Sequence, residues 1–478
     1  MFAATLATMF MAAIESTIVA TAMPSIVGAL GGFELFTWVF TAYLLTQAIT
    51  VPIYGRLADL YGRKRLLFLG IALFLAGSIL CGYAWNMTAL IVFRVVQGLG
   101  AGAVVPVSQT LLGDIYHGAE RARMQGYISS VFASSALLGP VVGAVLVAHT
   151  SWSMVFWVNV PLGLVAAAML AVTLRERVQR RQHRIDYPGA ILLALGTCVL
   201  MYALVDAAAL STRMVVVLVG GAVLLLGAFA LHEMRAHEPL LPLELWRNPM
   251  VTYGNIASLL SGAAMMGIAA FLPAYMQGAM GESVLAAGYA LMALSGGWPV
   301  GGFLAGRIAL AASYRAAVIS GGIVIVLGSL MMIALDPTRG AAWAIVSTLL
   351  IGFGMGLTNN TFGVAIQANV EWTQRGIATS STVFTRIVGS SLGTAVYGGI
   401  VNMGLAPHMT GGGDLVNRIM EPALRAAIPA AEIAPLMTAF AAALHRVYLI
   451  NGGLAVVIFL MALGMPRGLT PQGSSARS

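Results

Sequence analysis

The sequence predicts an all-α protein that is integral to a membrane, and three observations support that prediction. Of its 478 residues, 59% are hydrophobic, and the mean hydropathy is +0.90. Charged residues make up only 9% of the chain, which is too few to cover the surface of a soluble protein of this length. Apolar runs of about 20 residues, long enough to cross the hydrocarbon core of a bilayer, recur along the whole chain.

Charged residues and Gly/Pro clusters divide these runs into about fourteen predicted membrane-spanning helices. We expect the helices near residues 3–22, 36–55, 66–84, 88–112, 123–147, 152–173, 188–206, 214–232, 251–276, 285–306, 316–335, 341–358, 377–404 and 443–465. Two sets of about six helices flank the pair at 188–232, and such an internal repeat is typical of transporters. The expected domains are an N-terminal six-helix bundle at 1–173, a linker with two additional helices at 174–250, and a C-terminal six-helix bundle at 251–478 with a long outer loop at 405–442.

The distribution of positive charge predicts the orientation of these helices. An even number of spans puts both termini on one side, and cytoplasmic termini place most of the arginines in cytoplasmic segments. The basic segment LRERVQRRQHR at 174–184 is expected to be a cytoplasmic orientation signal that lies along anionic lipid. The stretch LVNRIMEPALRAAI in the outer loop is amphipathic, and it is expected either to lie on the membrane or to cap the exit.

Glu15 is the one acidic residue that falls well inside a predicted span. A carboxylate at membrane depth is unfavourable unless it is paired, hydrated or protonated, so its presence indicates a function. Burial favours the neutral form and a nearby arginine favours the anion, and a group that alternates between such environments can carry protons. The alternative is a buried acid that only forms hydrogen bonds to neighbouring helices.

A charged corner, GRLADLYGRKR at 55–65, lies on the short predicted turn between the second and third helices. Gly55 and Gly62 allow the close backbone approach that such a turn needs. Asp59 is the lone carboxylate among cations that include Arg63, and it is placed to meet a helix N-terminus or an arginine. An ordinary positive-inside turn would explain the cations but not the Gly and Asp spacing.

Four stretches together resemble the major facilitator superfamily. They are GRLADLYGRKR (55–65), RVVQGLGAG (94–102), LLGPVVGA (137–144) and ESTIVATAMPSI (15–26). The second is similar to the fourth-helix motif of proton-coupled members. The third is similar to the fifth-helix motif associated with antiporters, although it ends in Gly-Ala where the family usually has Gly-Gly. The last is similar to the first-helix signature of the fourteen-helix drug/proton antiporters, with Glu where Asp is commoner.

Further stretches resemble landmarks of that subfamily, so the resemblance covers nearly the whole chain. They are FWVNVPLG (156–163), DYPGA (186–190), EPLLPLELWRNP (238–249), LPAYMQGAMGESVLAAG (272–288) and GIATSSTVFTRIVGSSLGTA (376–395). Ser153 and Met154 replace the Arg-aromatic pair that usually follows Trp152. That departure weakens any inference about the outer end of the sixth helix, but not the resemblance as a whole.

The resemblance implies a fold and an activity. The fold is two six-helix bundles with two extra central membrane helices. The activity is proton-coupled export of hydrophobic or amphipathic, often cationic, compounds across the cytoplasmic membrane of a bacterium, in the manner of multidrug efflux. A dedicated exporter of one metabolite, antibiotic, siderophore or lipid precursor is the nearest alternative, followed by a sensor that transports nothing on the same scaffold. A proton symporter that imports its substrate is disfavoured by the fifth-helix motif.

The resemblance also implies roles for particular residues. Glu15 and Arg94 are expected to carry out proton coupling, because the first and fourth helices of the family both border the central cavity; the alternative for Arg94 is snorkelling to an interface. Gly55, Asp59, Gly62 and Arg63 would form a gating latch on the cytoplasmic side. Gly139, Pro140 and Gly143 would form the hinge of the antiporter motif.

Polar residues within the predicted spans or next to them are candidates for the lining of a substrate cavity. They are Gln47, Gln97, Gln109, Gln277, Asn359, Asn360 and Arg386, and for Arg386 packing or gating is as well supported as substrate contact. The glycine pairs Gly98/Gly102 and Gly352/Gly356 have the spacing of closely packed membrane helices. The 26 methionines suit a pocket for varied apolar cargo, although lipid-facing methionine is the simpler interpretation.

Several other classes of function are disfavoured by the sequence. There is no Walker loop, so the proton gradient rather than ATP is the expected energy source, and neither a nucleophile–base set nor metal-ligand spacing indicates an enzyme or a cofactor. Cys81 and Cys198 fall in apolar runs, which argues against a disulfide framework. The net charge of +8 is spread between the runs, so nucleic acid is not an expected partner. The expected partners are the lipid bilayer, a small-molecule substrate, protons and, in a two-membrane bacterium, a periplasmic adaptor.

Overall fold

The computed structural model describes residues 1–115, 118–174, 186–236, 240, 243–371, 375–409 and 430–465. Every regular element within these residues is a helix. Thirteen helices in this part of the chain are long and apolar enough to cross a membrane. The protein is therefore an all-α, multi-pass membrane protein, which confirms the predicted fold class.

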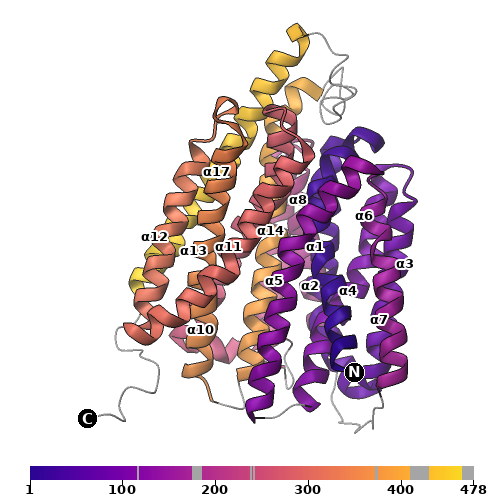
Figure 1. Ribbon diagram of the computed structural model, residues 1–478, viewed down its shortest axis with the longest axis vertical. Coiled ribbons are helices and arrows are strands. Elements are labelled where there is room, and N and C mark those ends of the chain that lie inside the picture. Colours follow the sequence, from indigo (N-terminus) through magenta and orange to yellow (C-terminus); the bar gives the residue numbers. More distant parts are fainter. Residues whose placement is uncertain are drawn as a thin grey trace. The chain divides into compact units, whose positions relative to one another are not determined.

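The chain forms two compact units, of which unit 1 comprises Met1–Leu240 and Leu405–Leu436. Figure 1 shows the helices of this unit running side by side along a common direction. They are α1 (Phe2–Leu30), α2 (Phe36–Tyr61), α3 (Arg63–Gly82), α4 (Met87–Ile115), α5 (Gly118–His149), α6 (Met154–Trp157), α7 (Asn159–Thr173), α8 (Tyr187–Val205) and α9 (Thr212–Glu233), with a short 3-10 helix at Phe33–Leu35.

Unit 2 comprises Leu241–Gly404 and Met437–Ser478. Its helices are α10 (Pro249–Ala274), a π-helical turn η3 (Tyr275–Ala279), α11 (Val284–Ala311), α12 (Tyr314–Ile333), α13 (Gly340–Asn369), α14 (Arg375–Met409) and α17 (Ala430–Gly464), with 3-10 turns at Leu243–Arg247 and Pro337–Arg339. A spanning helix satisfies its backbone groups internally, which is why apolar sequence adopts this form in a membrane.

Helix starts and turns carry the residue types that they need. Serine side chains cap three of the described helices: Ser211 accepts from Met214 N, Ser283 from Ala286 N and Ser313 from Ala316 N. Gly62 separates α2 from α3 with a φ of 91°, a conformation that favours glycine. The charged corner therefore turns sharply at the second of its two glycines.

Glycines allow α2 and α4 of unit 1 to approach closely. A Cβ atom at Gly98 would lie 2.7 Å from the backbone oxygen of Tyr43, and one at Gly102 would lie 2.0 Å from Oγ1 of Thr50. A larger residue at Gly98 would require movement of α2 itself, whereas one at Gly102 would first require the side chain of Thr50 to move. The glycine spacing noted in the sequence therefore lies at a helix crossing.

The same arrangement recurs in unit 2 between α11 and α13. A Cβ atom at Gly352 would lie 1.9 Å from the backbone oxygen of Leu294, and one at Gly356 would lie 2.0 Å from that of Trp298. Both contacts are with backbone atoms, so a side chain at either position would hold the two helices further apart.

The helices α8 and α9 form a hairpin whose two ends carry polar contacts. Asp186, at the start of α8, accepts a hydrogen bond from Gly189 N and lies 2.7 Å from Nε2 of His232, near the end of α9. At the other end Nε1 of Trp38 on α2 donates to Asp206 over 3.2 Å. Most of α9 is exposed, with Leu224 at 75%, so its apolar surface is available to lipid.

The structure differs from the sequence-based expectation at three places. The predicted span at 152–173 is divided at Val158 into α6 and α7. Residues 430–442, predicted within the outer loop, belong to α17, because this alanine-rich stretch has high helix propensity. The helix α14, predicted as a span near 377–404, is absent from the thirteen sufficiently apolar helices of the described residues, since its Ser, Thr and Arg side chains make it more polar.

Two predicted segments lie outside the described residues. They are most of the basic connector at 174–184 and the part of the outer loop that includes LVNRIMEPALRAAI. The roles expected for both segments stay predictions.

A buried ion pair in unit 1

Glu15 lies in the middle of α1 and is fully buried. Its Oε1 forms an ion pair with Nη1 of Arg94 on α4, and its Oε2 accepts a hydrogen bond from Nδ2 of Asn159 at the start of α7. Both carboxylate oxygens therefore have a partner inside the unit. The structure thus brings Arg94 against Glu15 rather than to an interface.

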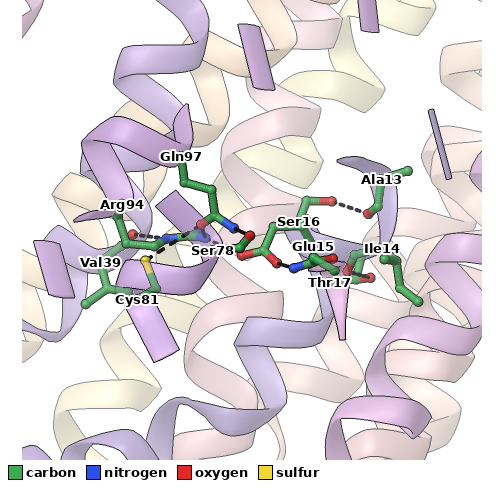
Figure 2. A network of polar contacts seen from close by, with 11 residues as sticks. Ala13, Ile14, Glu15, Ser16, Thr17, Val39, Ser78, Cys81, Arg94 and Gln97 are labelled. Carbon is green, nitrogen blue, oxygen red and sulfur yellow. Dashed lines mark hydrogen bonds and ion pairs between the residues drawn. The ribbon is translucent and has the colours of Figure 1, made fainter. Parts of the chain in front are cut away.

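Arg94 is only 1% exposed, and it has acceptors besides the carboxylate. Its Nε donates to the backbone oxygen of Val39 over 3.2 Å, and its Nη1 donates to Oε1 of Gln97 over 2.6 Å (Figure 2). The guanidinium carbon lies 4.1 Å from the ring centre of Tyr43 and 5.9 Å from that of Phe156. These ring faces attract a cation, so Arg94 is stabilised from several sides.

Gln97 links the ion pair to α3. Its Nε2 donates to Oγ of Ser78 over 2.7 Å, and Sγ of Cys81 lies 4.0 Å from its Oε1. The contact is possible because Gly77 stands opposite: a Cβ atom there would lie 2.5 Å from the backbone nitrogen of Gln97. Figure 2 shows these side chains converging from α1, α3 and α4, and Gln97 is the one cavity candidate that joins the ion pair.

Asn159 and Phe156 are site residues that the sequence reasoning did not identify. Both belong to FWVNVPLG, which was recognised only as a landmark of the subfamily. The break at Val158 between α6 and α7 puts Phe156 beside Arg94 and Asn159 on Glu15. The available signal was an amide residue within an otherwise apolar segment, which at membrane depth needs a polar partner.

Because the pair is buried, the stability of each charge depends on its partners within the protein. Two charges taken out of water are tolerated only when each has good partners, and removal of one partner leaves the other charge uncompensated. When Glu15 is neutral, Arg94 still has Val39 O, Gln97 Oε1 and the Tyr43 ring. The site can therefore hold the arginine with the carboxyl either ionised or protonated.

The antiporter-motif residues pack α5 on the part of α1 that carries Glu15. A Cβ atom at Gly139 would lie 2.0 Å from Oγ1 of Thr17, and one at Gly143 would lie 2.3 Å from Oγ1 of Thr21. The helix α5 is continuous through Pro140. These residues are thus packing contacts of α1, and their role as a hinge stays a prediction.

The charged corner contacts the end of α7. Nζ of Lys64 donates to the backbone oxygen of Leu174 over 2.6 Å and lies 3.5 Å from that of Ala171. A cation at this position satisfies the last carbonyls of α7 and complements its dipole. Arg63 follows the turn at Gly62 and is half-buried, whereas a Cβ atom at Gly55 would meet no atom within 4 Å.

The side chain of Asp59, the central residue of the predicted latch, lies outside the described residues. The latch itself, formed by Gly55, Asp59, Gly62 and Arg63, therefore stays a prediction.

The remaining cavity candidates are not part of the ion pair. In unit 1, Gln47 is half-buried and Gln109 is exposed. In unit 2, Gln277 is buried in the π-helical turn η3, and Nδ2 of Asn359 donates to Oγ of Ser261 over 3.0 Å.

Two further candidates lie in unit 2. The exposed Asn360 faces Gly302, and the half-buried Arg386 approaches Gly262 through its backbone oxygen. A cavity-lining role for any of these residues stays a prediction. Among the described residues, no three His, Cys, Asp or Glu side chains gather as a metal site would require.

Comparisons with known proteins identify the family. The model of the Major Facilitator Superfamily matches residues 5–394. Multidrug resistance protein 3 of Bacillus subtilis is 34% identical over 81% of this chain and 76% of its own length, and the multidrug transporter protein MdtP of the same organism is 34% identical over 82% and 73%. A solved bacterial homologue of the human lysosomal transporter Spinster superposes with a TM-score of 0.69 at 14% identity, over 97% of this chain and 95% of that one. The chain belongs to the major facilitator superfamily, and it is a membrane transporter rather than an enzyme.

Proposed function

We propose that this protein is a proton-coupled antiporter that exports hydrophobic or amphipathic, often cationic, compounds from the cell. The names of the two Bacillus subtilis relatives support export of varied drugs. The observation that carries the proton coupling is the buried pair of Glu15 and Arg94, in which the arginine has further acceptors of its own.

The proposed cycle uses one carboxyl group. Glu15 takes a proton from outside, which removes its negative charge and weakens the hold of the protein on a cationic cargo. Arg94 stays on Val39 O, Gln97 and the Tyr43 ring while the carboxyl is neutral. Alternating access then exposes the site to the inside, where the proton leaves and the ion pair forms again.

The proposed setting is the cytoplasmic membrane of a bacterium, with both termini in the cytoplasm. Its support is the arginine distribution, since positively charged loops stay inside. In this orientation the charged corner and the start of α8 are cytoplasmic. The latch around Asp59 would hold the cytoplasmic side closed, and an adaptor would extend the path in a two-membrane cell.

Exchange of one proton for one monovalent cation moves no net charge across the membrane. The membrane potential is worth about 2.3 kcal/mol per charge per 100 mV, and it would contribute nothing to such an exchange. The pH gradient alone would then drive export of a monovalent cation. Strong dependence on voltage at fixed pH would contradict a cycle with one carboxyl group.

The experiment that tests this function uses purified protein in proteoliposomes with a pH gradient and the fluorescent lipophilic cation ethidium. The wild type should move ethidium in the direction opposite to that of the protons. In a weakly buffered solution it should also release protons when ethidium is added. Glu15→Gln, which lacks the negative charge as the protonated state does, should bind a neutral cargo, hold ethidium more weakly than the wild type and exchange no protons. Glu34→Gln, which changes an exposed carboxylate near the same end of the chain, is the matched control and should behave as wild type.

Retention of proton exchange by Glu15→Gln would refute the proposal. A dedicated exporter of one compound would share this site and would differ in its cargo. Growth protection of a sensitive host against chemically varied compounds distinguishes the two, because a dedicated exporter would protect against one chemical class only.

A further inference from the structure

The amide of Asn159 uses only one of its two ends. Its Nδ2 donates to Oε2 of Glu15, while its Oδ1 accepts no hydrogen bond from any residue that the structure describes. The side chain is fully buried, so bulk water does not reach that oxygen. A buried acceptor without a donor is unfavourable, and such groups in native proteins call for an explanation.

Protonation of Glu15 changes what its neighbours must provide. An ionised carboxylate only accepts hydrogen bonds, whereas a protonated carboxyl has an O–H that needs an acceptor. Arg94 has donors only and cannot take that role. Oε1 of Gln97 already accepts from Arg94 over 2.6 Å and also faces Sγ of Cys81.

Among the residues that the structure describes, three titratable groups interact electrostatically with Glu15. They are Arg94 on α4, Tyr43 on α2 and Cys81 on α3, while α7 contributes only the neutral amide of Asn159. The hydroxyl of Tyr43 also has no partner among the described residues, but its ring lies against the guanidinium of Arg94 rather than having a recorded contact with the carboxyl. Asn159 thus combines direct contact with Glu15 and an unoccupied acceptor.

We propose that Asn159 is a positioning residue for proton exchange, whose amide serves both states of Glu15. With the carboxylate ionised, Nδ2 donates to Oε2. When a proton binds to Oε2, rotation of the amide by about half a turn about its Cβ–Cγ bond presents Oδ1, which accepts the new O–H. One hydrogen bond joins the two side chains before and after the step, and the proton leaves by the reverse rotation.

The residue type fits this role. Only the amides Asn and Gln combine a two-hydrogen donor with a neutral carbonyl acceptor on one rotatable group. An aspartate at 159 would place a second negative charge beside the carboxylate, and a leucine would serve neither state. The break at Val158 fixes the start of α7, and with it the position of this amide, against the middle of α1.

The inference rests on the proposed proton coupling, and infrared difference spectroscopy can test the two separately. Full-length protein is titrated in lipid, and the carboxyl and amide carbonyl bands are assigned with Glu15→Gln and Asn159→Leu. On protonation of Glu15, the amide carbonyl band of Asn159 should move to lower frequency, because its oxygen becomes a hydrogen-bond acceptor. An Asn159 band that stays fixed while Glu15 takes its proton would overturn the inference.

Exchange kinetics give a second readout. Asn159→Leu should slow ethidium-coupled proton release by about tenfold or more while ethidium binding persists, since the protonated state loses its acceptor. Asn255→Leu is the matched control: Asn255 is equally buried in unit 2, and both its amide ends are in use on Ser381 and Thr382. It should leave the exchange rate unchanged.

The outcomes separate the two ideas. If Glu15→Gln keeps proton exchange, the proposed function fails. If Glu15→Gln abolishes exchange but Asn159→Leu exchanges at the wild-type rate, only the role of Asn159 fails. Should Asn159→Leu not fold, the smaller polar replacement Asn159→Ser assigns the amide band instead, and the band shift in the wild type still decides the inference.

Discussion

Units 1 and 2 build the same kind of helix crossing, yet among the residues that the structure describes only unit 1 has a charge pair beside it. Gly98 packs α4 on Tyr43 of α2, and Gly352 packs α13 on Leu294 of α11 in the same way. Arg94 stands four residues before Gly98, and the residue four before Gly352 is Thr348. The hydroxyl of Thr348 bonds to the backbone of its own helix, at Ala344 O.

The acidic partner follows the same correspondence. Gly139 on α5 faces the backbone oxygen of Ile14, which precedes Glu15, whereas Gly389 on α14 faces that of Leu259, which precedes Leu260. Gln97 corresponds to Ile351 by the same count. The helices α10 to α14 and the span Pro435–Gly464 of α17 contain no acidic residue in their sequence, and the one acid of α17, Glu432, precedes that span. The crossings of unit 2 therefore form without an ion pair, so an ion pair is not required for this kind of helix packing. Because the burial of two charges is unfavourable, the presence of the pair in unit 1 indicates a function.

The largest effect should come from removing one member of the pair. Arg94→Met leaves Glu15 buried without its cation, and the free energy of unfolding should fall by about 3–5 kcal/mol at neutral or higher pH. Denaturant unfolding in detergent measures this change. Thr348→Val, at the corresponding position of unit 2, is the control and should change the free energy by about 1 kcal/mol or less.

Replacement of both Glu15 and Arg94 tests most directly whether unit 1 is stable without its ion pair, as unit 2 is. Glu15→Leu combined with Arg94→Met gives unit 1 the apolar character of unit 2, and stability should return to within about 2 kcal/mol of wild type while proton exchange stays lost. A double variant as unstable as Arg94→Met alone would show that the pair holds the fold together after all.

An intermediate effect is expected at the crossings that the two units share. A Cβ atom at Gly356 would meet a backbone oxygen, which cannot move alone, whereas one at Gly102 would meet the side chain of Thr50, which can rotate. Gly356→Ala should therefore destabilise by about 1–3 kcal/mol and Gly102→Ala by less. Gly220→Ala, with no atom within 4 Å, is the control. Equal losses at Gly102 and Gly356 would mean that α2 is as rigid as a backbone contact.

The smallest effect concerns Asp186, at the start of α8 and outside the spans. Burial raises the pKa of Asp186, but hydrogen bonds from Gly189 N and His232 outweigh burial and hold that pKa below its usual value. A lowered pKa in the folded state stabilises the fold above the unfolded value of about 3.9, and this contribution is lost as pH falls through the folded value. Asp186→Ala should therefore cost about 1 kcal/mol at pH 7 and progressively less below pH 4, as followed by thermal unfolding.

Asp186→Asn, which keeps a capping side chain, should lose less stability than Asp186→Ala at neutral pH. If both variants were equally unstable at pH 7, the cap would contribute nothing and the contact with His232 would account for the whole effect.

Much of the fold could be predicted because hydropathy reports directly on membrane spans. Glu15 could be identified as well, because an acidic residue inside an apolar run is energetically unfavourable and therefore indicates a functional site. Whether the side chain of Arg94 points to Glu15 or to the membrane interface could not be predicted, because a long side chain in a span can reach an interface or a buried partner equally well. Asn159 was missed because its role depends on the break at Val158, which no local pattern indicates. The start of α17 was missed because an alanine-rich segment is compatible with a loop or a helix.

The two ends of α7 connect parts of the molecule that lie far apart in the sequence. One end presents Asn159 to Glu15, and just beyond the other, at Leu174, the chain accepts the ammonium group of Lys64 from the charged corner. A helix of 15 residues is a stiff rod about 22 Å long. An axial shift of α7 at the charged corner would therefore reach the carboxyl group of Glu15. We expect a substitution at Lys64 to disturb the proposed proton exchange although Lys64 contacts no residue of the ion pair.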